Sequence, residues 1–478
     1  MKKEKLDELE QLKAELAISK KEIKSLTGKL ERSRTKISTQ KAELKKKRDR
    51  DYRSERRTVT ITLEPISRHR YKELVVRLST LLYTRVNCGF RSVVKILEII
   101  NDAFEGILGR IPSRNTIENW IKKCGLDIYN HPHHLDKSND YAMIIDESMM
   151  IGSEKLLVTQ GIPACHKGTP VKEKDVCILD MSVSSSWDSE GVKDRLFVAA
   201  NKMGSLPRYV ISDNASIMKG GIARALLPYH RDISHSLGMF LERCYKEEED
   251  FRLYTKSMSE AQFKHNMKKI AYLLPPRQRT IARFINLSNW VEWSQKILNV
   301  YHRLTPQERM AFAFVTTNAS LIDELSEVME CINYIEKNCK HNGLSSETIK
   351  QCLENIRRTL FKGNIRMRTL GEAICRFLLE EGELLENEKS AHNNSSDIIE
   401  STFGIYKQRK SANKLYGVTA FILFMPTYAK FASKEYNQVK SIKGHLENVR
   451  LGQILQWTKD NLTTNLVIKR IETLNATG

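Results

Sequence analysis

The stretch from Arg208 to His235 reads RYVISDNASIMKGGIARALLPYHRDISH. It opens on a short apolar, β-branched run that ends at Ser212, and this pattern predicts a buried strand. Asp213 follows at once, and a carboxylate at the end of a buried strand is costly unless it is paired. Ligands of α/β sheets bind where strands end, although Asp-Asn after a strand is also a common turn or helix cap. The stretch therefore predicts either an acid delivered to a ligand-binding edge or, more simply, a turn.

The composition indicates a globular protein with a polyanionic partner. The chain has 478 residues, of which 41% are hydrophobic, which is enough for about three domains and a sizeable core. Lys and Arg total 78 against 58 Asp and Glu, so the net charge is +20. Such an excess favours nucleic acid over a membrane surface as the partner.

Cysteine usage and the absence of apolar targeting segments bear on location. The nine cysteines include no C-x-x-C pair, which suits reduced thiols in an intracellular protein. The N-terminus MKKEKLDELE lacks the apolar region of a secretory signal, and the apolar run at 418–425 is too short to span a bilayer. We therefore expect a cytoplasmic protein, nucleoid-associated if bacterial, that has no membrane partner.

Residues 1–50 have a charged helical pattern with an apolar heptad repeat. Its first seam position is occupied throughout by Leu9, Leu16, Ile23, Leu30, Ile37 and Leu44. A seam of this length predicts a coiled coil, through which a homodimer or higher homo-oligomer would form. A single amphipathic helix lying on the body is the alternative, because the second seam position is only partly apolar and Gly28 weakens the helix.

Residues 57–130 are predicted to form a small, mainly helical DNA-binding domain that begins with a strand at 57–63. Ser113 suits the N-cap and Gly125 the C-cap of its last helix. The inward face of this helix carries Ile117, Trp120 and Ile121, and its outward face carries Arg114, Asn115, Asn119, Lys122 and Lys123. This division is typical of the recognition helix of a helix-turn-helix, although an ordinary surface helix has a similar pattern.

The part of the chain from 138 to 240 predicts a mixed sheet. Three apolar runs between residues 141 and 183 precede a helix at 189–203, and the strand of the opening stretch comes next. Consecutive strands followed by helix-separated ones predict a mixed sheet with helices on both faces. The first strand ends at Asp146 and can lie beside the strand that ends at Asp213. The two acids would then meet at one edge.

Two adjacent carboxylates repel each other unless a cation lies between them. Their oxygens suit Mg²⁺ or Mn²⁺, and a pair of such ions can hold both the attacking and the leaving oxygen of a phosphodiester displacement. That chemistry uses a third carboxylate. Glu147, beside Asp146, and Asp180, in the third strand, are alternative candidates for the ligands, or are plain surface charges.

The order of these residues resembles the DDE transposases of insertion sequences, which belong to the ribonuclease H-like, retroviral-integrase superfamily. The resemblance lies in the strand order, in the spacing of Asp146 and Asp213 (213 − 146 = 67), and in Asp232-Ile-Ser-His235, which is similar to the (C/D)xxH signature of some members. The family has a third acid on a later helix. Glu400, within residues 395–409, fits that position best, and Asp397 competes with it.

The resemblance implies roles for the candidate site residues. Asp146, Asp213 and Glu400 would be catalytic and would bind two Mg²⁺ (or Mn²⁺) ions. Asp232, His235 and Lys407 would support the site, since the family often has a basic residue about seven positions after its third acid. A satisfied structural histidine is the alternative for His235. The partner would be double-stranded DNA, both the terminal inverted repeats of a transposon and the target.

The implied function is metal-dependent cleavage and transfer of DNA strands at transposon ends. The alternatives are a structure-selective nuclease on the same fold and a catalytically inactive DNA-binding regulator. Trp290 and Trp293 are expected to be core residues, with stacking on a flipped base as the alternative. The expected order of parts is a coiled-coil helix (1–50), a helix-turn-helix domain (57–130), the first part of a ribonuclease H-like core (138–240), an all-helical insertion (241–392), the last part of the core (393–435) and a helical tail (436–478).

Overall fold

The computed structural model describes residues 19–21, 24–29, 31, 33–46, 66, 69–132, 140–148, 150–277, 284, 287–387, 390–431, 442–463 and 466–476. The chain divides into two compact units, Met1–Glu64 and Pro65–Gly478. The described residues of the first unit are helical, and Leu26, Ile37 and Leu44 are exposed there. The strand predicted at 57–63 lies outside the described residues.

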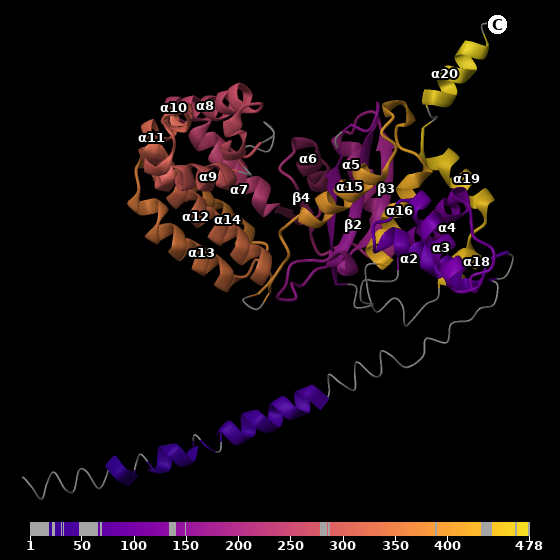
Figure 1. Ribbon diagram of the computed structural model, residues 1–478, viewed down its shortest axis with the longest axis horizontal. Coiled ribbons are helices and arrows are strands. Elements are labelled where there is room, and N and C mark those ends of the chain that lie inside the picture. Colours follow the sequence, from indigo (N-terminus) through magenta and orange to yellow (C-terminus); the bar gives the residue numbers. More distant parts are fainter. Residues whose placement is uncertain are drawn as a thin grey trace, which may run out of the picture. The chain divides into compact units, whose positions relative to one another are not determined.

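The described residues of the second unit contain five strands, which form one mixed sheet (Figure 1). The order is β3-β2-β1-β4-β5, with β2 antiparallel to β1 and β3, and with β4 parallel to β1 and β5. The predicted mixed sheet is confirmed, and its order is compatible with a ribonuclease H-like core. The strands are β1 (Tyr141–Glu147), β2 (Lys155–Pro163), β3 (Cys177–Ser184), β4 (Val210–Ser212) and β5 (Tyr229–Arg231).

The two faces of the sheet have different helical partners. On one face Met143 and Ile145 of β1 pack with α5 (Ser189–Met203) and α6 (Ser216–Arg224). On the other face Ile144 packs in a cluster that includes residues of α15 (Asp397–Arg409). Because successive side chains of a strand point to opposite faces, Asp146 shares the face of Ile144 and α15.

The helices α2 (Glu73–Thr84), α3 (Phe90–Ala103) and α4 (Arg114–Asn130) pack around a common core. The C-terminal helices α16 (Phe424–Phe431) and α18 (Ile442–Asn448) contribute residues to the same core. The remaining helices of the tail are α19 (Leu451–Asn461) and α20 (Leu466–Asn475). Segments near the C-terminal end of the chain therefore complete the core of α2, α3 and α4. The hydrogen bond between Lys123 and Leu446 joins residues that lie more than 300 positions apart in the sequence.

The ends of α4 test two predicted caps. The Ser113 side chain accepts a hydrogen bond from the Thr116 N–H (3.3 Å), so the predicted N-cap is confirmed. The predicted C-cap at Gly125 is wrong, because α4 continues to Asn130. Gly125 instead allows a close helix contact, since a Cβ atom there would lie 1.8 Å from the Leu423 carbonyl oxygen.

The segment between β5 and α15 is helical and has its own hydrophobic core, as predicted. Trp290 is buried in this core, as predicted, whereas Trp293 is partly buried and packs against it. The indole N–H of Trp290 donates to the Pro276 carbonyl (2.8 Å) and that of Trp293 to the Leu273 carbonyl (2.9 Å). The predicted start of the insertion at residue 241 falls inside α7. The helices are α7 (Ile233–Tyr245), α8 (Glu249–His265), α9 (Leu287–Val300), α10 (Pro306–Ala311), α11 (Ala313–Thr317), α12 (Ala319–Asn342), α13 (Ser346–Arg358) and α14 (Ile365–Gly382).

Two general expectations can be compared with the structure. All nine cysteines lie among the described residues and have free thiols, in agreement with the expected reduced state. Within the described part of the chain, the helices are either too short or too polar to cross a bilayer.

We predict that Gly125→Ala destabilises the protein by about 3 kcal/mol, because the added methyl group must displace the Leu423 backbone from a packed interface. Urea denaturation gives the free energy of unfolding. Gly444→Ala in α18 is the matched control, since a Cβ atom there meets nothing within 4 Å and raises helix propensity by up to about 1 kcal/mol. Equal stability of the two variants would contradict the close contact.

Candidate active site

The register of β1 and β4 brings two acids to the same sheet edge. Met143 pairs with Val210 and Ile144 with Ile211. Continued by two residues, this parallel register sets Asp146 opposite Asp213, which follows the last residue of β4. The Ala215 N–H donates to the Asp213 carboxylate (3.1 Å).

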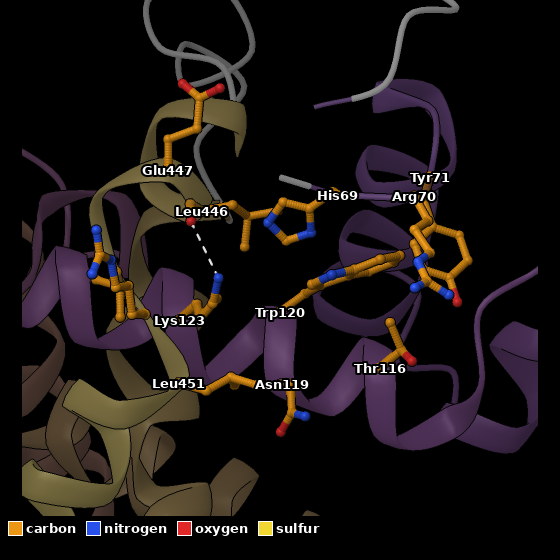
Figure 2. A pocket seen from close by; sticks show the side chains of 12 residues that line it. His69, Arg70, Tyr71, Thr116, Asn119, Trp120, Lys123, Leu446, Glu447 and Leu451 are labelled. Carbon is orange, nitrogen blue, oxygen red and sulfur yellow. Dashed lines mark hydrogen bonds between the residues drawn. The ribbon is translucent and has the colours of Figure 1, made fainter. Parts of the chain in front are cut away.

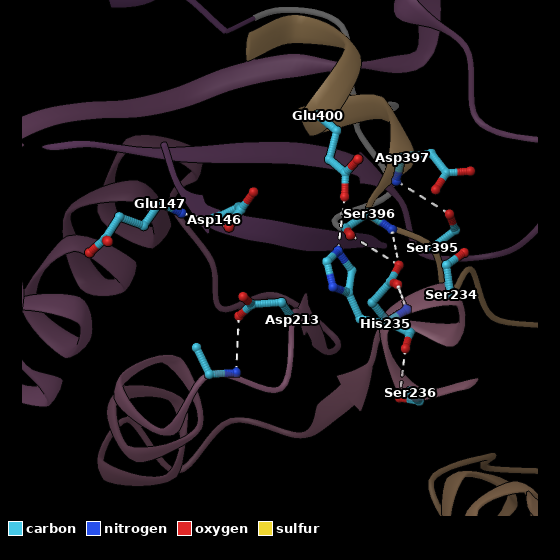
Figure 3. Close-up of polar contacts among 12 residues, drawn as sticks. Asp146, Glu147, Asp213, Ser234, His235, Ser236, Ser395, Ser396, Asp397 and Glu400 are labelled. Atoms are coloured by element: carbon cyan, nitrogen blue, oxygen red, sulfur yellow. Dashed lines mark hydrogen bonds and ion pairs between the residues drawn. The ribbon is translucent and has the colours of Figure 1, made fainter. Parts of the chain in front are cut away.

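Helix α15 supplies the third acid over the same face of the sheet. Ile398, Ile399 and Phe403 pack in the cluster that contains Ile144, and Glu400 lies between them in sequence with a side chain 54% exposed. Figure 3 shows Asp146, Asp213 and Glu400 around one space, with Glu147 pointing away. The structure therefore brings together the three acids that the sequence singles out.

The pKa of Asp146 reflects this convergence. Burial raises the pKa of Asp146 to about 7, and the nearby charge of Asp213 and, more weakly, that of Glu400 raise it too. The hydrogen bond from the Glu147 N–H (2.7 Å) and the charge of His235 act in the opposite direction without cancelling the rise. The three carboxylates thus interact electrostatically, and Asp146 is partly protonated near neutral pH.

Glu400 is held by a cationic histidine. The Nε2 atom of His235 lies 2.9 Å from Oε1 of Glu400. This hydrogen bond raises the pKa of His235 to about 9, although burial opposes the rise, and it lowers the pKa of Glu400. At neutral pH the pair is therefore an imidazolium bonded to a carboxylate.

Asp232 forms hydrogen bonds with both α7, the helix of His235, and the start of α15, the helix of Glu400. Its carboxylate caps α7 by accepting from the His235 N–H (2.7 Å). Its other oxygen accepts from both the N–H (2.6 Å) and the hydroxyl (3.0 Å) of Ser396, at the start of α15. Ser396 occupies the N-cap position of α15, but its hydroxyl bonds Asp232 and makes no capping hydrogen bond to its own helix.

The competing acids are engaged elsewhere. Glu147 bonds Lys155 (2.5 Å), and Asp397 bonds Lys340 of α12 (2.5 Å). Asp180 is buried and accepts from the hydroxyls of Tyr129 (3.1 Å) and Ser182 (2.8 Å). These contacts give each acid a structural partner away from the shared space.

Lys407 lies two helical turns after Glu400 on α15, as predicted. Its ammonium group lies 5.6 Å from the centre of the Phe403 ring, and its charge contributes to the lowered pKa of Glu400. Lys407 therefore acts on Glu400 electrostatically.

The outward face predicted for α4 is only partly open. Arg114 and Asn115 are exposed, whereas Lys122 bonds Glu118 (2.6 Å). Asn119 and Lys123 line a cavity that α18 helps to enclose (Figure 2), because the tail packs on this side of the helix. The connection from Phe104 to Ser113, between α3 and α4, is longer than the three- or four-residue turn of a helix-turn-helix.

A buried polar cluster next to the site is absent from the sequence predictions. His230 of β5 bonds Glu381 of α14 (2.7 Å) and His392 (2.9 Å), and the Tyr209 ring stacks on His392 at 4.5 Å. The cluster anchors the loop that precedes α15. No local sequence pattern indicates the cluster, because β5 reads Tyr229-His230-Arg231 and His392 lies in a polar loop without periodicity.

The carboxylate set fits a hard divalent cation in chemistry, because it offers oxygen ligands whose mutual repulsion a cation would relieve. In the arrangement described, no three His, Cys, Asp or Glu side chains among the described residues are placed to hold a metal ion. Glu400 is instead bonded to His235.

Comparisons with protein-family models and with curated proteins found no match to this chain.

We predict that Asp146→Asn removes a pH-dependent loss of stability. An acid whose pKa is raised by folding binds its proton more tightly in the folded state, so wild-type stability falls as the pH rises from about 4 to about 7. The variant should therefore exceed wild type in unfolding free energy by roughly 4 kcal/mol at most at pH 8, and by little at pH 4. Urea denaturation at both pH values tests this, with Glu147→Gln as the neighbouring control. A pH-independent difference would contradict the raised pKa.

Proposed function

We propose that the chain is a metal-dependent polynucleotidyl transferase of the DDE type, which cleaves DNA strands at transposon ends and transfers them to target DNA. The observation that carries this proposal is the convergence of three distant acids. The β1–β4 register pairs Asp146 with Asp213, and α15 brings Glu400 over the same face. A polynucleotidyl transferase of this type needs such a set of carboxylates at one sheet edge.

In this proposal Asp146, Asp213 and Glu400 hold Mg²⁺ (or Mn²⁺). When bound, the cations neutralise the charge that develops in phosphodiester displacement. His235 keeps the Glu400 carboxylate ionised, and Asp232 holds the helices of both residues in place. A bound cation would offset the repulsion from the other two carboxylates, so Asp146, whose pKa is about 7, would hold it in the deprotonated form.

Double-stranded DNA is the proposed partner, as terminal inverted repeats and as target. The support is the net charge of +20 and the exposed Arg114 and Asn115 at the first turn of α4. The group of α2, α3 and α4, in which the connection before α4 is longer than the turn of a standard helix-turn-helix, would place this first turn against the duplex. The remaining proposed contacts of α4 are limited by the ion pair of Lys122 and by the cavity around Asn119 and Lys123.

Self-association through residues 1–50 is part of the same proposal. Leu26, Ile37 and Leu44 are heptad positions with exposures of 62%, 52% and 66% on a helical segment. Apolar side chains at heptad spacing become buried when a second copy packs against them. A coiled coil would in this way bring two transposon ends together.

A catalytically inactive DNA-binding regulator is the second candidate. It is favoured by the bond between Glu400 and His235, which engages the third acid with a protein cation. Such a protein would bind DNA near promoters and would not cleave it.

We predict that Asp146→Asn, Asp213→Asn and Glu400→Gln each lower Mg²⁺-dependent cleavage of the DNA flanking the gene by about a thousand-fold or more, since each removes a charge worth several kcal/mol in the transition state. Gel analysis of end-labelled DNA measures cleavage, and a mobility-shift assay should show retained binding. Glu147→Gln is the control, because it alters a neighbouring acid whose side chain pairs with Lys155 away from the shared space and should leave cleavage largely unchanged.

Cleavage that survives all three substitutions would remove the catalytic assignment. DNA binding by wild type without any cleavage in Mg²⁺ or Mn²⁺ would favour the regulator.

We predict that Ile37→Lys and Leu44→Lys reduce the molecular mass in solution from an oligomer to a monomer at micromolar concentrations, because they place charges in the proposed seam. Sedimentation equilibrium measures the mass. Thr39→Lys, two residues after Ile37 and on the outer side of the heptad, is the control and should remain oligomeric. The same mass for all variants would contradict association through this segment.

A further inference from the structure

The cavity beside α4 has walls from three distant parts of the chain. The segment before α2 contributes His69, Arg70 and Tyr71, α4 contributes Trp120, and α18 and α19 close the other side (Figure 2). The volume of about 340 Å³ lies at the lower end of the range of small-molecule sites, which is roughly 300–1,000 Å³. The cavity thus has room for one small planar ligand.

Aromatic rings form part of the wall. The Tyr71 ring meets the Trp120 ring edge to face, with centroids 5.1 Å apart, and the His69 ring lies 6.4 Å from that of Trp120. Burial, together with the charge of Lys123, lowers the pKa of His69, so this imidazole is neutral at pH 7. Trp120 is only 3% exposed, so His69 and Tyr71 are the rings of this wall that a ligand can contact. Aromatic rings of this kind stack on nucleobases with little regard to sequence.

Cations outnumber anions around the same space. The lining includes Arg70, Lys123 and Arg450 against the single carboxylate of Glu447. Arg70 and Arg450 are exposed at the rim, while Lys123 lies deeper and donates to the Leu446 carbonyl (3.4 Å). The excess of positive charge suits a ligand that carries a phosphate.

Asn119 adds a side-chain amide to the lining, which can both donate and accept hydrogen bonds. Aromatic rings, cations and an amide around one small volume match a nucleotide better than an apolar molecule or an acidic side chain, neither of which uses all three. We infer that this cavity binds a single unpaired nucleotide of a DNA strand, with its base beside Tyr71 and His69 and its phosphate toward Lys123 and the rim arginines. This inference rests on the proposed DNA-binding function and adds the recognition of an unpaired nucleotide to the binding of duplex DNA.

The inference predicts different roles for two neighbouring lysines of α4, Lys122 and Lys123. A helix that only reads a groove would use Lys122 and Lys123 alike, because both follow the same face of the predicted recognition helix. The cavity involves Lys123 and leaves out Lys122, which is bonded to Glu118. This pair of adjacent lysines is therefore a matched test.

The experiment uses the full-length protein and three probes: a fully paired duplex, the same duplex with one extrahelical nucleotide, and free deoxyadenosine monophosphate. Fluorescence anisotropy gives the affinities of the duplexes, and calorimetry gives that of the free nucleotide. We expect the protein to prefer the duplex with the unpaired nucleotide by about tenfold, which is within the range of stacking on one base. Lys123→Ala and Arg70→Ala should abolish that preference, whereas Lys122→Ala and Lys95→Ala, an exposed position on α3, should keep it.

Arg70 is an exposed side chain, so its removal tests the cavity without disturbing the contact of Lys123 with α18. Equal affinity for both duplexes together with no binding of the free nucleotide overturns the inference and leaves the proposed DNA cleavage untouched. Binding of the free nucleotide that is lost in Lys123→Ala, without a preference between duplexes, supports the nucleotide chemistry and assigns the cavity to a soluble nucleotide. If the protein prefers the unpaired nucleotide but cleaves no DNA, the inference is supported and the proposed catalysis is wrong.

Discussion

The buried carboxylate of Asp232 is the contact on which the geometry of the site depends. It accepts hydrogen bonds from the His235 N–H and from the N–H and hydroxyl of Ser396, a residue 164 positions later in the chain. A carboxylate taken out of water is tolerated only when such donors replace the lost hydration. It also lies at the first turns of both α7 and α15, where the helix dipole favours a negative charge. The relative position of His235 and Glu400 follows from this one anion.

The helical segment between the second and third acids helps to fix the site. Glu381 of α14 bonds His230 of β5, and Lys340 of α12 bonds Asp397 at the start of α15. The backbone of His392 pairs with that of Leu344 just before α15 begins. Without these contacts, a connection as long as that between Asp213 and Glu400 would leave the third acid poorly placed, because long connections have much conformational freedom. Here the helical insertion helps to hold α15, the helix of Glu400, against the sheet.

Local patterns predict the elements well, and contacts between distant segments account for what they miss. The strand that contains Asp146, the strand that precedes Asp213 and the helix of Glu400 follow from the spacing of apolar residues, which acts within a few residues. Gly125 suggests a helix end by local rules, yet its role is a close approach to Leu423, almost 300 positions away. Likewise, nothing near Lys123 in the sequence indicates that α18 lies on that side of α4. The His230–Glu381–His392 cluster joins three elements at once and has no local signature.

The electrostatics of Asp146 help to decide between the two candidate functions. Burial and the charges of two other carboxylates disfavour its ionised form, so the folded protein is less stable with an acid there than with a neutral side chain of the same shape. A protein that only binds DNA gains nothing from this cost, and perturbed acids of this kind are typical of functional sites. A divalent cation that binds only the folded state would turn the repulsion into a favourable interaction and would raise the stability with its concentration. The unfavourable placement of Asp146 is therefore the physical argument for catalysis over simple DNA binding.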